Sequence, residues 1–160
     1  KIALDLKIKP SIIQKTIPKI FFEGRLQYLN KGKLRKYIYK NEKILLDGAH
    51  SNTSAQNLFN YLKTLKLPIY GIWGMTKNKD PNLFIKQFKG IFRKIITISI
   101  ENEKNCMSAK NLEVIAKKNQ FNAEKAKNFN EAIRKITSKD KKLIICIGSL
   151  YNVGNILNKN

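Results

Sequence analysis

The pattern of hydrophobic and polar positions changes its period within residues 43–65, from that of a strand to that of a helix. Three consecutive apolar residues, Ile44, Leu45 and Leu46, are typical of a buried parallel strand. Residues 47–50, with the sequence Asp-Gly-Ala-His, join this strand to the helix. Because the carboxyl ends of parallel strands line the ligand crevice of an open sheet, we expect any functional site to begin at this joint. The apolar face of the predicted helix consists of Ala55, Leu58, Phe59, Leu62 and Leu65.

The alternation of strand and helix continues to the end of the chain. Further strands are predicted over residues 68–74, 94–100 and 143–147. Further helices are predicted to start at Pro81 and after Ser108, and to cover residues 128–138 and 154–157. Strands and helices that alternate with short connections indicate an α/β fold, with a mostly parallel sheet covered by helices on both faces.

Two elements are expected before this sheet. The amphipathic segment 3–20 looks like the end of a longer protein, and residues 11–20 predict a short linker helix that Ser11 caps and Pro18 terminates. Residues 28–39 contain two runs separated by Asn-Lys-Gly at 30–32, which predicts a β-hairpin.

A net charge of +21 over 160 residues raises the question of nucleic-acid binding, because Lys and Arg neutralise phosphates. The excess is mostly lysine, scattered through all segments among many Asn and Ile residues, a bias typical of AT-rich genomes. Forked, bidentate contacts are offered only by Arg25, Arg35, Arg93 and Arg134. Net charge bears on association rather than on reaction, so it favours a nucleic-acid role only weakly. A stand-alone basic α/β module that binds nucleic acid or a protein partner is the alternative function.

Other classes are disfavoured by what the sequence lacks. Cys106 and Cys146 are far apart and have no His or Cys at metal-ligand spacing, which argues against a disulfide scaffold and a zinc site. The longest apolar runs fall far short of the roughly 20 residues that span a bilayer, and no signal peptide opens the chain. We therefore expect a soluble, cytoplasmic domain. The glycines form neither a P-loop nor a dinucleotide-binding fingerprint.

Four short motifs carry a resemblance to a known family. In chain order they are Gly-Arg-Leu-Gln at 24–27, Leu-Asp-Gly-Ala-His at 46–50, Gly-Met at 74–75 with Lys-Asp at 79–80, and Gly-Ser-Leu-Tyr at 148–151 followed by Val153 and Gly154. Together they resemble the C-terminal domain of folylpolyglutamate synthase and dihydrofolate synthase, in the Mur ligase superfamily. The resemblance implies a Rossmann-like domain over residues 21–160, with residues 1–20 as the end of a preceding ATPase domain and a linker.

The resemblance also implies a reaction. Such ligases use ATP to convert the carboxylate of dihydropteroate or a folate to an acyl phosphate, which the amine of L-glutamate attacks to give an amide. In this family the P-loop, the Mg²⁺ ligands and much of the pterin site lie in the N-terminal ATPase domain. We therefore expect no catalytic residue and no metal ligand on this chain alone. Its expected contribution is to close over ATP, in an enzyme that is usually a monomer.

Three residues are candidates for nucleotide binding by this resemblance. Arg25 would contact the phosphates, Asp47 would bind the ribose hydroxyls, and His50 would hydrogen-bond the nucleotide or orient its loop. Each also has a structural alternative: a surface ion pair for Arg25, a cap of the following helix or turn for Asp47, and satisfaction of backbone groups for His50. Lys79 and Asp80 are weaker candidates, because Asn78 replaces the first aspartate of the family's Asp-Lys-Asp pattern.

Overall fold

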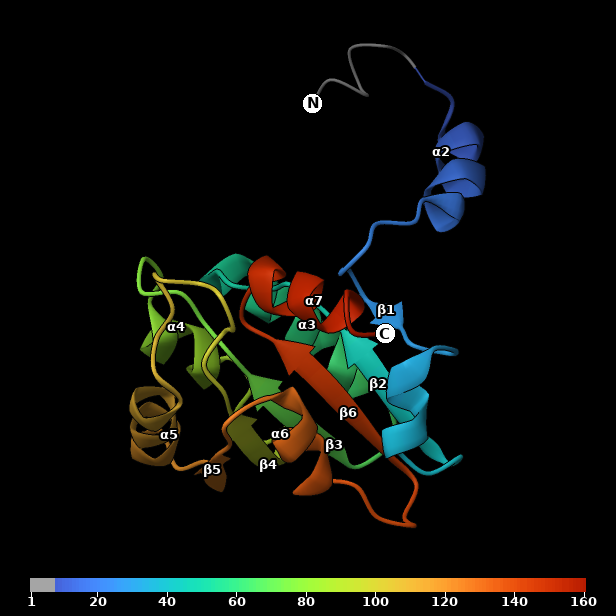
Figure 1. Ribbon diagram of the computed structural model, residues 1–160. Helices are drawn as coiled ribbons and strands as arrows, with labels where there is room; N and C mark the ends of the chain where they lie inside the picture. The colour runs from blue at the N-terminus through green and yellow to red at the C-terminus, as the bar shows by residue number, and fades with distance from the viewer. Residues whose placement is uncertain (1–7) are drawn as a thin grey trace.

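Six strands form one sheet in the computed structural model, which describes residues 8–160 (Figure 1). The strands are β1 (Gln27–Tyr28), β2 (Glu42–Leu46), β3 (Ile69–Trp73), β4 (Phe92–Thr97), β5 (Ala123–Lys125) and β6 (Lys142–Ile147). Their order across the sheet is β1-β2-β6-β3-β4-β5. Only β1 is antiparallel to its neighbour, and the other pairings are parallel. The prediction of a mostly parallel sheet is confirmed.

Helices cover both faces of this sheet, as the sequence predicts. The helices α3 (Asn52–Thr64), α4 (Pro81–Lys86) and α5 (Ala109–Lys118) bury their apolar residues on one face. The helices α6 (Phe129–Arg134) and α7 (Leu150–Leu157) and the 3₁₀ helix η2 (Lys33–Tyr37) cover the other face. Since successive strand residues point to opposite faces, Leu45 joins the first cluster while Ile44 and Leu46 join the second. The continuous apolar run of β2 is thereby buried on both sides.

The carboxyl ends of β2, β6 and β3 lie side by side, because β6 pairs with both other strands. The chain leaves β2 and β3 toward helices on one face of the sheet, whereas it leaves β6 toward α7 on the opposite face. Loops that depart to opposite faces leave a crevice at the strand ends, which is where open α/β sheets bind ligands. The joint at residues 47–50 lies at this crevice.

The predicted hairpin at residues 28–39 is wrong. β1 does form an antiparallel pair, but its partner is β2, and residues 33–37 form η2 instead of a strand. The helical turn directs Leu34 into the second apolar cluster, where it is 2% exposed. Burial of this side chain on the sheet outweighs the local turn signal of residues 30–32.

The linker helix is present as α2 (Pro10–Thr16), followed by the 3₁₀ helix η1 (Ile17–Lys19). Ser11 does not cap it, because Pro10 occupies the first turn and the N-cap residue is Lys9. α2 buries none of its residues and stands away from the sheet in Figure 1. The first part of the predicted amphipathic segment, residues 3–7, lies outside the described residues.

A buried ion pair joins the amino ends of β2 and β6. Glu42 is 1% exposed, and its carboxylate accepts hydrogen bonds from the backbone N–H groups of Tyr39 at 2.8 Å and Ser138 at 2.9 Å. The Lys142 ammonium lies 3.9 Å from the Glu42 carboxylate and donates to the Ile136 carbonyl at 3.1 Å. These contacts satisfy both buried charges at the edge of the sheet opposite to the crevice.

We expect Glu42→Ala to lower the free energy of unfolding by about 3–5 kcal/mol, because Lys142 and two backbone N–H groups lose their buried partner. Urea denaturation of wild type and variant measures the difference. Glu124→Ala is the control, since it removes an exposed ion pair with Lys94 at 2.8 Å and should cost less than about 1 kcal/mol. Equal losses in the two variants would contradict the role of the buried pair.

Candidate functional site

Asp47 is the first residue after β2, and its side chain joins two loops. The carboxylate is almost fully buried: Oδ1 accepts a hydrogen bond from the Ala49 N–H at 2.8 Å, and Oδ2 accepts one from the Leu26 N–H at 2.9 Å. The first bond tightens the turn at residues 47–50. Asp47 therefore does cap its own turn, which is one of the structural roles that the sequence allowed for it. Ser51 rather than Asp47 caps α3, through a reciprocal capping box with Ser54. The second bond attaches the segment that carries Arg25.

Arg25 lies on the turn formed by residues 24–27. The Gly24 carbonyl accepts the Gly48 N–H at 2.8 Å, so backbone and side-chain contacts both connect this turn to the loop after β2. The Arg25 guanidinium is 4.0 Å from Asp47 Oδ1, and its side chain is 44% exposed. At this distance the two groups attract each other without a hydrogen bond. The structure thus brings Arg25 and Asp47 together, with the arginine facing solvent.

His50 is the last residue of the same loop, but it lines a different pocket from Arg25 and Asp47. Its Nδ1 lies 2.7 Å from the Gly48 carbonyl oxygen. A carbonyl can only accept, so Nδ1 carries the hydrogen, and Nε2 is the acceptor when the ring is neutral. The histidine thus hydrogen-bonds a backbone carbonyl, which is the structural role that the sequence allowed for it. Its Nε2 is left to bind a ligand.

The three predicted residues line two different pockets. One of about 300 Å³ contains Arg25, Asp47 and the first half of α3. A larger one of about 530 Å³ contains His50 and Lys79 at the carboxyl ends of the strands. Asp80 does not line either pocket; it caps α4 by accepting the Leu83 N–H at 2.9 Å. The remaining residues of the larger pocket are Thr76, Asn78, Glu103, Asn105, Ser149, Leu150 and Tyr151.

Sequence reasoning missed Glu103 and Asn105. They lie in the loop after β4, which reaches the pocket because Thr76 and Cys106 form an antiparallel bridge. The Lys77 N–H donates to the Asn105 carbonyl at 2.8 Å and reinforces this contact. The only available signal was that this loop also follows the carboxyl end of a strand.

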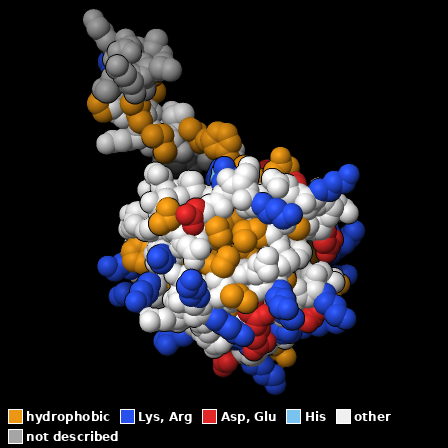
Figure 2. All heavy atoms as spheres, turned by 90° about the vertical axis from the view of Figure 1, so that its left-hand side faces the viewer, with side chains coloured by type: hydrophobic (Ala, Val, Ile, Leu, Met, Phe, Trp, Pro, Cys, Tyr) orange, Lys and Arg blue, Asp and Glu red, His pale blue; other side chains and the backbone are white. Residues whose placement is uncertain are grey.

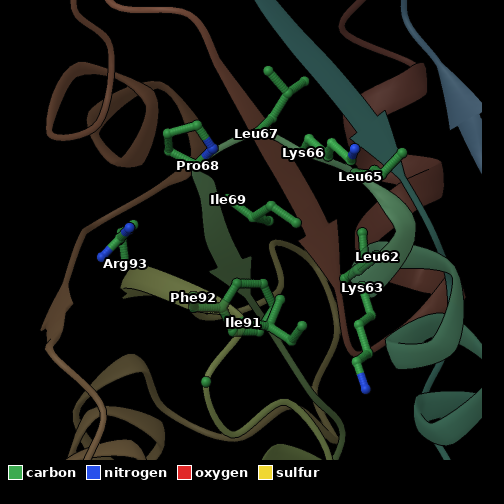
Figure 3. A pocket seen from close by; sticks show the side chains of 11 residues that line it. Leu62, Lys63, Leu65, Lys66, Leu67, Pro68, Ile69, Ile91, Phe92 and Arg93 are labelled. Carbon is green, nitrogen blue, oxygen red and sulfur yellow. The ribbon is translucent and has the colours of Figure 1, made fainter.

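A third pocket, of about 710 Å³, lies at the opposite edge of the sheet, near the amino ends of β3 and β4 (Figure 3). It has an apolar floor, and Figure 3 shows the charged ends of Lys63, Lys66 and Arg93 pointing away from one another. Three cations among 11 lining residues is close to the proportion of Lys and Arg in the whole chain, 32 of 160. Neither its position nor its charge indicates a built site.

Charged side chains of both signs are mixed on one face of the molecule. On the face that Figure 2 shows, Lys and Arg side chains are spread out and interspersed with Asp and Glu.

Within residues 8–160, no group of three or more His, Cys, Asp or Glu side chains is arranged to hold a metal ion. Cys146 is fully buried, and burial raises the pKa of its thiol above the ordinary value, which makes it unreactive. In the same part of the chain, no helix has the length and apolar character needed to cross a membrane.

The sheet order and the loops at its carboxyl edge define an open, mostly parallel α/β domain with a crevice at the strand ends. The sequence profile described as "Dihydrofolate synthetase, C-terminal domain" matches residues 30–159, and the chain belongs to that family. The match begins after the turn that carries Arg25. No curated protein sequence gives a significant match to the chain.

Solved structures of folate ligases share this fold. Folylpolyglutamate synthase of Mycobacterium tuberculosis complexed with ADP superposes with a TM-score of 0.78 at 15% identity, over 95% of this chain and 35% of that one. Escherichia coli FolC in complex with DHPP and ADP gives 0.74 at 17% identity, over 95% and 34%. The bifunctional enzyme of Yersinia pestis complexed with AMPPNP and Mn ion gives 0.73 at 18% identity, over 94% and 34%. The chain spans about a third of each relative's length.

Gly148, between β6 and α7, is a sensitive position beside the site. Its φ is +103°, and a Cβ there would overlap the Gly74 carbonyl oxygen. We expect Gly148→Ala to lower the free energy of unfolding by more than about 2 kcal/mol. Gly154→Ala, inside α7 with open space around the added methyl group, should instead raise it by up to about 1 kcal/mol. Thermal unfolding of both variants measures the contrast, and a stable Gly148→Ala protein would contradict the crowding described here.

Proposed function

We propose that this chain is the C-terminal part of an ATP-dependent ligase that adds L-glutamate to dihydropteroate, to folates or to both, through an acyl phosphate. The observation that carries the proposal is the family match over residues 30–159. The relatives complexed with ADP and with DHPP support nucleotide and pterin substrates, because their fold covers nearly the whole of this chain. We further propose that the enzyme acts in the cytoplasm as a monomer.

Arg25 is proposed to contact the nucleotide phosphates. Its guanidinium is permanently charged, offers a fork of N–H donors and is 44% exposed on a firmly attached turn. A fixed cation of this kind stabilises negative charge that develops on a phosphoryl group in transfer. Asp47, 4.0 Å away, orients the guanidinium without engaging it in a hydrogen bond.

Asp47 and His50 are proposed to act beside it. A carboxylate has about four acceptor positions, and the Asp47 hydrogen bonds to the two backbone N–H groups use two of them. The others can accept ribose hydroxyls while the carboxylate holds its loops. His50 Nε2 can accept a hydrogen bond from a ligand, and Lys79 in the same pocket supplies a positive charge.

The remaining machinery is proposed to lie in a preceding ATPase domain, for which residues 1–20 form the end and the linker. The Mg²⁺ ligands are proposed to lie in that domain as well. Apolar side chains of the linker and of the two residues that follow it are more than half exposed, which supports packing against another domain. Those residues are Ile12, Ile17, Ile20, Phe21 and Phe22. Arg25 would then reach the nucleotide by closure of one domain over the other.

Arg25→Ala should lower kcat/KM for ATP at least about 100-fold in the full-length enzyme, because one preorganised phosphate contact is lost. Phosphate release dependent on ATP, dihydropteroate and glutamate measures the activity. Arg93→Ala is the control, since it removes an exposed arginine at the opposite edge and should leave kcat/KM unchanged. Equal activity of wild type and Arg25→Ala would refute the role of Arg25, and no folate-dependent turnover in wild type would refute the ligase.

Asp47→Ala should lower both activity and stability, in contrast to Arg25→Ala. We expect about a 100-fold loss of kcat/KM and a loss of about 2–4 kcal/mol in the free energy of unfolding, because two backbone N–H groups lose their acceptor. Arg25→Ala, an exposed substitution, should change stability by less than about 0.5 kcal/mol. Urea denaturation beside the phosphate-release assay separates the two variants. An Asp47→Ala protein as stable as wild type would show that the carboxylate does not hold the loops.

A further inference from the structure

The turn that presents Arg25 has an unusual backbone. Two of its residues have positive φ: Gly24 at 71° and Leu26 at 43°. Gly24 adopts this conformation readily, but Leu26 has a side chain that makes it unfavourable, so the surrounding contacts must hold it. The turn is therefore maintained by specific bonds rather than by local preference.

Each backbone N–H from Gly24 to Leu26 has a partner. The Arg25 N–H donates to the Phe22 carbonyl at 3.2 Å, and the Leu26 N–H donates to Asp47. The Gly24 N–H donates to the side-chain oxygen Oε1 of Gln27 at 2.7 Å. Among these bonds, only the last connects the two ends of the turn directly.

Gln27 itself is firmly placed. It lies on β1, where it pairs with Leu46 of β2, one residue before Asp47. The amide oxygen of Gln27 thus fixes the start of the turn relative to the sheet, while Asp47 fixes its third residue. Arg25 lies between these two attachments.

We propose that Gln27 is a positioning residue for the ligase reaction, which holds the 24–27 turn closed so that Arg25 meets the nucleotide phosphates. This inference rests on the proposed function. Gln27 acts through Arg25, and its required property is a hydrogen-bond acceptor at the end of a side chain of this length. Glutamate shares that property, whereas methionine has similar length and a thioether that accepts only weakly.

The test is a double-mutant cycle in the full-length enzyme, with ATP, dihydropteroate and glutamate as substrates and phosphate release as the readout. Gln27→Met should lower kcat/KM about tenfold when Arg25 is present, because a small misplacement of a catalytic contact is costly. In the Arg25→Ala background the same change should cost less than about twofold, since there is no guanidinium left to position. Gln27→Glu should remain within about threefold of wild type.

Amide hydrogen exchange at Gly24 provides a second readout that does not depend on activity. Protection should be lost in Gln27→Met and kept in Gln27→Glu. Equal losses of kcat/KM in both Arg25 backgrounds, or no loss in either, would overturn the positioning role while Arg25→Ala still reports the ligase. Absence of ATP-dependent turnover, or a harmless Arg25→Ala, would instead overturn the proposed function and this inference with it.

Discussion

The carboxylate of Asp47 connects two segments that are 21 residues apart in the chain, through a partly buried hydrogen bond to the Leu26 N–H and a buried one to the Ala49 N–H. Bonds of this kind are strong because the acceptor is charged and little water competes for it. They account for the left-handed conformation of Leu26, which a leucine would not adopt unaided. Together with the bonds of Gly24 to Gly48 and Gln27, this side chain fixes the position of Arg25 and with it the shape of the smaller pocket.

The charged groups at the two edges of the sheet lie in different environments. At the carboxyl edge, the loops after β2, β3, β4 and β6 form a pocket with polar and charged groups exposed to solvent. At the amino edge, the charged groups Glu42 and Lys142 are buried and fully engaged with one another and with backbone atoms. The charged groups at the amino edge are thus closed off from ligands, whereas those at the carboxyl edge remain open to them.

The repeating elements were predictable because their patterns are local. Alternation of apolar runs with helical spacing located β2, β3, β4 and β6 and the helices between them, and motif order identified the family. The short strand β5 escaped prediction because only Ala123 of its three residues is buried. The secondary structure of residues 33–37 depended on where Leu34 could be buried, which no local pattern shows.

The candidate site was predictable only in part. Arg25, Asp47 and His50 stand in motifs, and the structure places the first two within 4.0 Å of each other. Their proposed roles in nucleotide binding stay predictions. The bond from Leu26 to Asp47 and the approach of Glu103 to His50's pocket are tertiary contacts, so neither spacing nor composition could reveal them. The closure of the turn by Gln27 is a side-chain contact of the same kind.

The buried pair at the amino edge also favours the observed register of the strand that leads to the site, as does the apolar pattern of β2. Glu42 and Lys142 are direct neighbours in the parallel pairing of β2 with β6, and Leu46 is paired with Cys146 at the other end. A slip of one residue would separate the two charges and turn Leu45 to the wrong face of the sheet. It would also carry Asp47 to the opposite side, away from Leu26. By stabilising this strand register, the ion pair helps to place the loops at the opposite end of the strands, although it makes no contact with them.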